Sequence, residues 1–244
     1  MVITSLENEK IKNVVKLGQK KYRDLTSKYV VEGLHLVEEA ISADVVEEIF
    51  LVEGSNLDFD ILTTYISKEV MNKISTMESS SEVLAICKKK EYNKLIGNKL
   101  LLLDDVQDPG NLGTIIRSAL SFDVDMIILS NNSVDLYNPK VLRATQGMYN
   151  HIPIMRGDLK EVIKDIKTKN IPVYGTNVED GFDIKNLTSE EKQSFALIMG
   201  NEGNGVSIDI QKLCDKNLYI PINKKVESLN VGVACSIILY ELGR

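Results

Sequence analysis

The sequence predicts an α/β protein in which a mostly parallel sheet carries helices on both faces, with a smaller α/β domain before it. In residues 99–244, apolar runs of strand length alternate with stretches of helical periodicity, and the turns between them are short. Residues 1–92 show the same alternation on a smaller scale. Because the polar, basic stretch KKKEYNKLIGNK separates them, we predict a domain over residues 1–92, a linker over 93–98 and a domain over 99–244.

The first domain is predicted to begin with a basic amphipathic helix over residues 7–17, with Ile11, Val14 and Val15 on its apolar face. The other predicted elements follow in order: a strand KYVVEG, a helix HLVEEAIS, a strand EEIFLVEG, a helix SKEVMNKIS and a strand SEVLAICKK.

The second domain is predicted to open with a buried strand, KLLLLDDV. The next elements are a helix NLGTIIRSALSF, a strand VDMIILS, a helix NPKVLRATQGMY, a strand HIPIMR, a helix DLKEVIKDIKTKN, strands IPVYGTN, SFALIMGN and KNLYIPI, and a helix NVGVACSIILYELGR. Pro139 falls in the first turn of its helix, where its missing N–H is tolerated. The closing helix is apolar nearly all round, so it needs cover beyond its own sheet, and a subunit interface would supply it.

The composition is that of a soluble globular protein, with 43% hydrophobic and 26% charged residues in 244. Cys87, Cys214 and Cys235 are widely spaced and form no CxxC pair, which predicts reduced thiols rather than disulfides or a zinc site. No apolar run approaches the roughly 20 residues of a membrane span, and the N-terminus lacks the apolar core of a signal peptide. We expect a cytoplasmic protein with no metal site and no membrane contact.

Charge is distributed unevenly along the first domain, although the net charge of the chain is −6. Residues 1–30 carry seven Lys and Arg against three Asp and Glu, whereas residues 31–60 carry nine acidic residues and no Lys or Arg. The basic end could contact phosphate groups or could be a solvated helix face, and charge alone leaves both interpretations open.

Several common signatures are absent. The chain has no GxxxxGK[ST] phosphate loop and no GxSxG turn, and the glycines of GNEGNG do not have the GxGxxG spacing. Only His35 and His151 are present, so a histidine-based triad or a histidine-rich metal site has little material.

The stretch GNLGTIIR follows the first strand of the second domain. Asn111 is a residue that can cap the next helix, and Gly110 and Gly113 allow close backbone approach. Arg117 lies about one helical turn further on, so a helix N-terminus and a planar cation together suit a phosphate group. A capped helix with one surface Arg is the alternative.

The stretch MGNEGNGVS follows another predicted strand and places Asn201 and Glu202 between glycines. A carboxylate between glycines is not crowded by other side chains, so it suits hydrogen bonding to a ligand. The alternative interpretation is that the glycines serve only to turn the chain. The stretch IPINKKVESLNVG follows the last strand, and its Ser228 or Asn230 could cap the closing helix. Ligands of parallel sheets bind at the carboxyl ends of strands, which is where all three stretches lie.

In order and spacing, these stretches together resemble the three motifs of the SpoU (TrmH-like) family of RNA ribose 2′-O-methyltransferases in the SPOUT superfamily. The first motif is Asn111-x-Gly113-x-x-x-Arg117, the second is Gly200-Asn201-Glu202-Gly203, and the third is Pro221 with Ser228-Leu229-Asn230. The likeness covers residues 98 to 244, and more loosely the first domain, where YVVEGLHLVEEAI resembles the family's L30e-like RNA-binding domain. NPKVLRATQGMYNHIPI matches a family segment with an Arg, here Arg143, although Gln146 stands where small residues are commoner.

The resemblance implies a C-terminal trefoil-knot domain that binds S-adenosylmethionine in the knot, largely through backbone groups. It also implies a homodimer packed through the closing helix, in which the partner contributes to the active site. The residues it assigns to the cofactor are Gly200, Ile220, Leu229, Thr176, Asn177, Asn201 and Gly203.

The implied reaction is methyl transfer to a ribose 2′-hydroxyl, without a metal ion. The residues implied at the reaction centre are Arg117, Asn111, Glu202, Ser228 and Asn230. Free Arg is a poor base, so we expect Arg117 to hold the substrate phosphate and orient the hydroxyl, with the phosphate or a perturbed Arg accepting the proton. Glu202 is expected to order the site.

The implied substrate is RNA, which gives the basic N-terminal segment a role in contacting it. We expect Lys20, Lys21, Arg23 and Arg143 to bind RNA. The two-domain organisation favours 23S rRNA as the substrate. A tRNA methyltransferase of the same superfamily and a non-catalytic RNA-binding or ribosome-assembly factor are the alternatives, and a role in antibiotic resistance would use the same chemistry.

Overall fold

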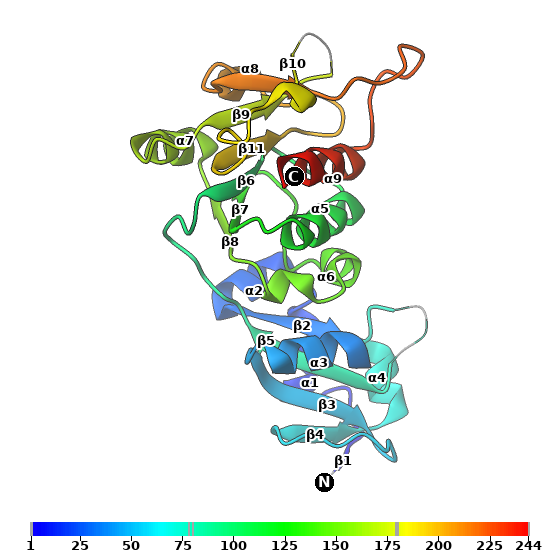
Figure 1. Cartoon of the computed structure of the whole chain (residues 1–244). Helices are drawn as coiled ribbons and strands as arrows, with labels where there is room; N and C mark the ends of the chain where they lie inside the picture. Colours follow the sequence, from blue (N-terminus) through cyan, green and yellow to red (C-terminus); the bar gives the residue numbers. More distant parts are fainter. Residues whose placement is uncertain (1, 78, 80, 179–180, 244) are drawn as a thin grey trace. The chain divides into compact units, whose positions relative to one another are not determined.

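The computed structural model describes residues 2–77, 79, 81–178 and 181–243 (Figure 1). By its contacts the chain divides into two compact units: Met1–Lys90 with Asp135–Asn150, and Glu91–Val134 with His151–Arg244. The predicted boundary lies within a few residues of the first crossing at 90/91. The prediction of two contiguous domains is wrong for residues 135–150, because this segment packs with the first unit.

The first unit is a mixed α/β structure. Its strands are β1 Val2–Ile3, β2 Lys28–Glu32, β3 Val46–Val52, β4 Thr63–Ile66 and β5 Val83–Lys88. Its helices are α1 Glu9–Lys16, α2 Lys20–Thr26, α3 Leu34–Ser42, α4 Lys68–Ile74 and α6 Pro139–Thr145, and a 3₁₀ turn η1 covers Met148–Asn150. The sheet order is β1-β4-β3-β5-β2, with β5 antiparallel to both neighbours and the other pairs parallel.

The predicted strands and helices of this unit are confirmed, and three further elements were not predicted: β1, α2 and β4. Each lacks a local pattern, because β1 has two residues and the sequences of α2 and β4, KKYRDLT and TTYI, show no clear apolar periodicity. Ile11 and Val14 pack into the core with Phe50 and Val70. The prediction for Val15 is wrong, since it lies 44% exposed.

The second unit holds a parallel sheet whose strands, as described, run in the order β10-β12-β9-β11-β6-β7-β8. The strands are β6 Lys99–Leu103, β7 Met126–Ser130, β8 Ile154–Gly157, β9 Val173–Thr176, β10 Phe182–Asp183, β11 Phe195–Met199 and β12 Lys216–Tyr219. The helices are α5 Pro109–Ser121, α7 Leu159–Thr168, α8 Ile208–Gln211 and α9 Val231–Leu242, with a 3₁₀ turn η2 at Ile184–Asn186. The predicted parallel sheet is confirmed, and only β10, α8 and η2 were not predicted.

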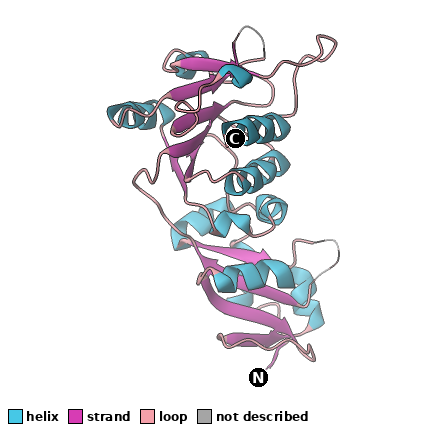
Figure 2. Ribbon diagram, in the orientation of Figure 1, coloured by secondary structure: helices cyan, strands magenta, loops and turns pink. Residues whose placement is uncertain are grey.

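Helices cover both faces of this sheet: α5 and α9 lie together on one side and α7 on the other (Figures 1 and 2). The central strands β6, β7 and β11 are almost entirely buried, which explains their apolar runs. The helices α5 and α9 approach closely, since a Cβ added at Gly232 would lie 3.1 Å from a Thr114 methyl carbon. This packing brings the first and third sequence motifs side by side.

The predicted helix NPKVLRATQGMY is shorter than expected. It ends where Gln146 takes a left-handed conformation, and the 3₁₀ turn η1 follows. Pro139 does lie in its first turn, behind an Asn138 cap.

Other expectations concern membrane spans, metal sites and cysteines. None of the helices among the described residues is both long and apolar enough to cross a membrane, and no metal-binding group of His, Cys, Asp and Glu occurs among them. The three cysteines are free thiols. The knotted path and the L30e likeness stay predictions from the family resemblance.

Candidate active site

The three predicted motifs follow strands that lie close together in the second sheet. The first follows β6, the second follows β11, which pairs with β6, and the third follows β12, one strand beyond β9. Since all these strands are parallel, their carboxyl ends lie at one edge of the sheet, and the loops that follow them meet there.

Glu202 joins the second motif to the first. Its carboxylate accepts hydrogen bonds from the backbone N–H of Asp108 at 3.0 Å and of Gln107 at 3.2 Å. It also accepts one from the Asn111 side-chain amide at 3.1 Å and one from the Asn201 amide at 3.4 Å. The donors lie in the loop after β6, in the first turn of α5 and in the turn after β11, so Glu202 ties two motifs together.

Asn111 continues the chain of contacts to the third motif. Its Oδ1 accepts a hydrogen bond from the Asn230 side-chain amide at 2.8 Å. Asn230 in turn caps α9, because its Oδ1 accepts hydrogen bonds from the N–H groups of Gly232 and Val233. The path Glu202–Asn111–Asn230 therefore crosses all three motifs.

The predicted capping roles are partly corrected. Asn111 does not cap α5: Asp108 is the cap residue, and its carboxylate accepts from the Asn111 N–H at 2.8 Å. The Asn111 side chain instead forms hydrogen bonds with Glu202 and Asn230. Of the two candidates for capping α9, the structure selects Asn230 rather than Ser228.

The Glu202 carboxylate is held in its charged form. Desolvation opposes ionisation, but the hydrogen bonds from Asp108, Asn111 and Gln107 outweigh it and hold the pKa of this carboxyl below its usual value. Since a carboxylate with a lowered pKa and occupied oxygens is a poor proton acceptor, Glu202 suits an organising role, as expected from the sequence.

Gly200 stands where the backbone crosses itself. A Cβ added here would lie 2.0 Å from the carbonyl carbon of Gly205 and 2.1 Å from the nitrogen of Val206. The turn is closed by two backbone hydrogen bonds between Asn201 and Gly205, each of 2.9 Å, and Gly205 has a φ of 67°. Gly203 is different, since the nearest atom to an added Cβ is the Asn201 Oδ1 at 3.6 Å. A side chain therefore has room at Gly203 but not at Gly200.

A pocket of about 360 Å³ opens beside this turn. Nine predicted site residues line it: Thr176, Asn177, Gly200, Asn201, Glu202, Gly203, Ile220, Ser228 and Leu229. Sequence reasoning missed three lining residues of α9, namely Val231, Ala234 and Ile238. Their i, i+3, i+7 spacing is a signal that could have found this face of the helix.

Sequence reasoning also missed two residues that directly follow the buried strand β6 and support the loops of the pocket. Asp104 accepts a hydrogen bond from the Ser207 N–H at 2.8 Å, and the Asp105 carbonyl accepts one from the Asn201 amide at 2.9 Å. The sequence signal that could have identified them is a pair of acidic residues directly after an apolar strand.

Arg117 is exposed on α5 and does not line the pocket of its own chain. Its neighbour Ser118 faces α9, where its hydroxyl lies 2.6 Å from that of Ser236. The structure thus unites Asn111, Glu202 and Asn230 but leaves Arg117 on the surface.

The residues predicted to bind RNA all lie in the first unit. Lys20 and Lys21 are exposed, and Lys20 forms an ion pair with Asp24 at 2.8 Å. Arg143 donates a hydrogen bond to the Thr76 hydroxyl at 3.0 Å. The prediction for Arg23 is wrong: it is 4% exposed, and its guanidinium bonds to the Leu17 and Gly18 carbonyls and to Asp135.

Sequence comparisons cover nearly the whole chain. Residues 98–240 match the profile of the SpoU rRNA Methylase family, and residues 8–85 match that of the MRM3-like substrate binding domain. The chain is 38% identical to "23S rRNA (guanosine(2553)-2'-O)-methyltransferase RlmP" of Bacillus subtilis (strain 168), over 98% of each protein.

Structural comparisons agree over the same length. An AdoMet-bound rRNA methyltransferase from Sinorhizobium meliloti superposes with a TM-score of 0.86 at 28% identity, covering 99% of this chain and 97% of that one. An RNA 2′-O ribose methyltransferase superposes with a TM-score of 0.82 at 26% identity, covering 99% and 98%. Both units of the chain therefore have counterparts in the same solved proteins.

Proposed function

Because this chain belongs to the SpoU rRNA Methylase family, we propose that it transfers a methyl group from S-adenosylmethionine to the 2′-hydroxyl of a guanosine in 23S rRNA. The observation that carries the proposal is the path Glu202–Asn111–Asn230, which joins the three motifs beside the pocket. The match to the Bacillus subtilis enzyme over 98% of both chains supports the choice of substrate.

The pocket fits the proposed cofactor. Its volume of about 360 Å³ lies within the usual range for small-molecule sites, about 300–1,000 Å³. Its lining combines apolar groups, such as Ile220 and Leu229, with the bare backbone of residues 200–205. Apolar walls suit an adenine ring, and main-chain polar groups suit the ribose and the amino acid part. Thr176, Asn177, Asn201 and Gly203 complete the proposed cofactor set.

The bound cofactor supplies an electrophilic methyl group on its sulfonium sulfur. The task of the protein is then to align the ribose oxygen with that methyl group and to accept the hydroxyl proton. We assign alignment of the ribose side to Asn111, Ser228 and Asn230, with Glu202 holding Asn111. Arg117 binds the neighbouring phosphate and orients the hydroxyl, so that a phosphate oxygen accepts the proton.

The position of Arg117 supports a homodimer with a shared active site. Arg117 lies outside the pocket of its own chain, so Arg117 of the partner subunit would complete the site. The helix α9 carries an exposed apolar stripe at i, i+4 and i+7, formed by Val233, Ile237 and Tyr240, which are 47%, 37% and 51% exposed. An exposed apolar stripe beside α5 suits a second copy of the chain.

Complementation tests the shared site. Arg117→Ala and Gly200→Ala are each expected to be inactive alone, since one lacks the substrate residue and the other the cofactor turn. Mixed and re-associated, they form dimers with one intact composite site, and about a quarter of the wild-type activity should return. No recovery in dimers shown to be mixed would mean that Arg117 acts within its own chain.

Labelled methyl transfer to unmodified 23S rRNA, with unmodified tRNA in parallel, tests the reaction and the substrate class. We expect label in 23S rRNA with the wild-type protein and none with Arg117→Ala. Calorimetry should show that this variant still binds the cofactor normally. Label in tRNA alone would keep the chemistry and replace the substrate. RNA binding without transfer would favour the assembly-factor alternative. We also propose a cytoplasmic location, as expected for a protein that modifies rRNA, and fractionation can check it.

A further inference from the structure

The first unit contains a cleft that no part of the proposed reaction uses. It measures about 170 Å³ and is formed by α1, β2, the end of α4 and α6. This is below the range of about 300–1,000 Å³ that encloses a whole drug-sized ligand, so it suits a single ring system. Its walls are largely apolar and include Val14, Leu17, Pro139 and Leu142.

Two cations stand among the residues that line this cleft, Lys73 from α4 and Arg143 from α6. Within the part of the chain that the structure describes, the Lys73 ammonium has no ion pair or hydrogen bond. The Arg143 guanidinium uses one nitrogen to bond to Thr76 at 3.0 Å, and its other N–H groups have no partner among the described residues. Apolar walls with unneutralised cations suit a ring that carries phosphate on its flanks.

Among the described residues, the cleft also contains one carboxylate, that of Glu32, which is buried and does not pair with either cation. Glu32 is buried at 7% exposure, and it accepts hydrogen bonds from the Thr76 N–H at 2.8 Å and from the Ser75 hydroxyl. Its oxygens are thus used to hold the turn after α4, beside Lys73.

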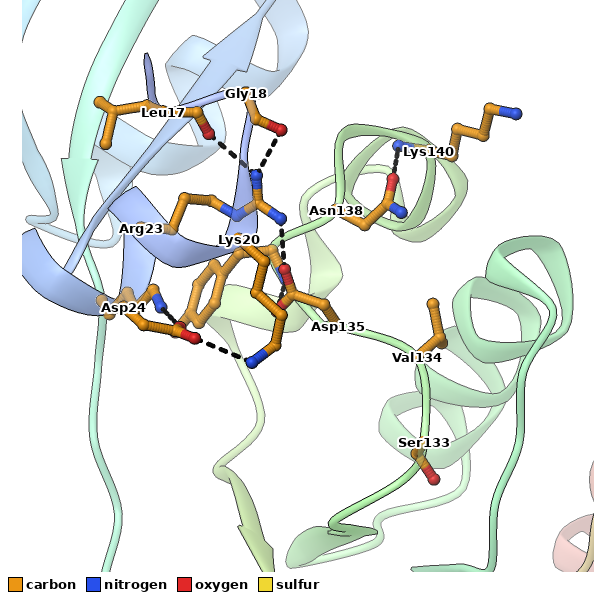
Figure 3. A network of polar contacts seen from close by, with 12 residues as sticks. Leu17, Gly18, Lys20, Arg23, Asp24, Ser133, Val134, Asp135, Asn138 and Lys140 are labelled. Carbon is orange, nitrogen blue, oxygen red and sulfur yellow. Dashed lines mark hydrogen bonds and ion pairs between the residues drawn. The ribbon is translucent and has the colours of Figure 1, made fainter. Parts of the chain in front are cut away.

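The buried Arg23 explains why Arg143 lies here. Arg23 holds Asp135, the first residue of the segment 135–150, and also bonds to the Leu17 and Gly18 carbonyls (Figure 3). The far end of the segment is fixed as well, since the Tyr149 hydroxyl donates to that of Tyr29 at 3.1 Å. Arg143 is therefore presented by a segment anchored at both ends rather than by a loose loop.

We propose that this cleft binds one unstacked nucleotide of the RNA substrate, away from the methylated position. The base enters between α1 and α6, and the phosphates on either side meet Lys73 and Arg143. Sequence-specific proteins recognise RNA mainly through unstacked bases in loops and bulges, and a recess beside cations suits such a base with its phosphates. The inference rests on the proposed RNA substrate and assigns it a second contact point.

Binding of an unmodified 23S rRNA transcript to the full-length protein tests the cleft separately from methyl transfer. The test variant is Lys73→Gln with Arg143→Gln. The matched control is Lys68→Gln with Lys140→Gln, which removes the same charge from the same two helices at exposed residues outside the cleft. We expect the test variant to raise the Kd at least tenfold and to lower the salt slope by about 1.4–1.8, for two phosphates. The control should change the Kd less than threefold.

A second pair of variants tests the apolar opening without touching the core. Val15 lines the cleft and is 44% exposed, whereas Leu25 is 75% exposed and lies outside it. Val15→Asp should weaken RNA binding at least fivefold and Leu25→Asp should not. Equal binding by wild type and both cleft variants would overturn the proposal even if methyl transfer is normal, as would loss at Leu25→Asp alone. Transfer that fails while the cleft variants still lose RNA binding would contradict the proposed reaction and support the cleft.

Discussion

Glu202 and Arg23 are two charged residues that the sequence assigns to functional sites, Glu202 to the reaction centre and Arg23 to RNA binding, and the structure uses them differently. Glu202 stays exposed at the edge of a pocket, where main-chain and amide N–H groups hold its carboxylate. Arg23 is 4% exposed, and its guanidinium donates hydrogen bonds to two backbone carbonyls and pairs with Asp135. One organises a site and the other anchors a chain segment.

The difference shows which sequence signals locate a side chain. Glu202 belongs to a motif of fixed spacing directly after a buried strand, so the parallel sheet dictates where it lies. Arg23 belongs to a run of basic residues, and a charge run does not say which of its members faces solvent. Four predictions break or sharpen this comparison.

The largest effect is expected when Asp135 is removed. Asp135→Ala leaves the Arg23 charge buried and unpaired, which costs about 3–5 kcal/mol of unfolding free energy. Glu7→Ala is the control, because Glu7 pairs with Lys12 at the surface, where the two side chains are 83% and 41% exposed and such pairs contribute little to stability. Urea denaturation measures both, and equal losses would mean that the buried pair is no more important than the surface one.

The next effect concerns the backbone that carries Glu202. Gly200→Ala forces a Cβ against Gly205 and Val206, and overpacking of this kind costs about 1–3 kcal/mol. We expect S-adenosylmethionine binding to fall at least a hundredfold in calorimetry. Gly203→Ala should bind within about threefold of wild type, because its Cβ would make only an ordinary van der Waals contact, 3.6 Å from the Asn201 Oδ1. Similar losses of affinity in both variants would contradict the claim that the turn excludes a side chain at Gly200 but not at Gly203.

Acid should loosen the site through Glu202 itself. Its pKa is lowered from 4.5, so the stabilising contribution of the ionised form is complete above that pH and is lost as the pH falls through the lowered value. Cofactor affinity should stay level from pH 7 to pH 5 and decline below about 4.5. Glu202→Gln should bind about tenfold more weakly at pH 7, since hydrogen bonds to charged groups contribute about 1.5–3 kcal/mol, and show a flatter pH profile. The same profile in both proteins would assign the decline to another group.

The smallest effect separates two neighbours in the basic run. Lys20 already pairs with Asp24, whereas Lys21 has no partner in the described structure. Lys21→Glu should therefore weaken RNA binding more than Lys20→Glu, and neutralising Lys21 should lower the salt slope by about 0.7–0.9. If neither substitution changes the Kd or its salt dependence, this face of α2 is merely solvated.

The predictable parts of the molecule were those with local patterns. The strands β6, β7 and β11 were readable as buried apolar runs, and the three motifs were readable because each follows such a strand. The Glu202–Asn111 bond joins residues 91 positions apart, yet adjacent parallel strands imply it.

Other parts depend on contacts that no local pattern reveals. The Arg23–Asp135 pair spans 112 positions, and nothing in the stretch DLYNP indicates that residues 135–150 pack with the first unit. The cap of α5 was misassigned for a similar reason. Asp108 and Asn111 are both good caps, and only the position of Glu202 decides which side chain is free to cap.

The most direct test of the central claim is the chemical position of the transferred methyl group. Unmodified 23S rRNA, treated with the enzyme and labelled S-adenosylmethionine, is digested to nucleosides and separated. We predict that the label is found in 2′-O-methylguanosine and disappears with Arg117→Ala. Label in a base-methylated nucleoside, or no label despite binding of both cofactor and RNA, would contradict the account.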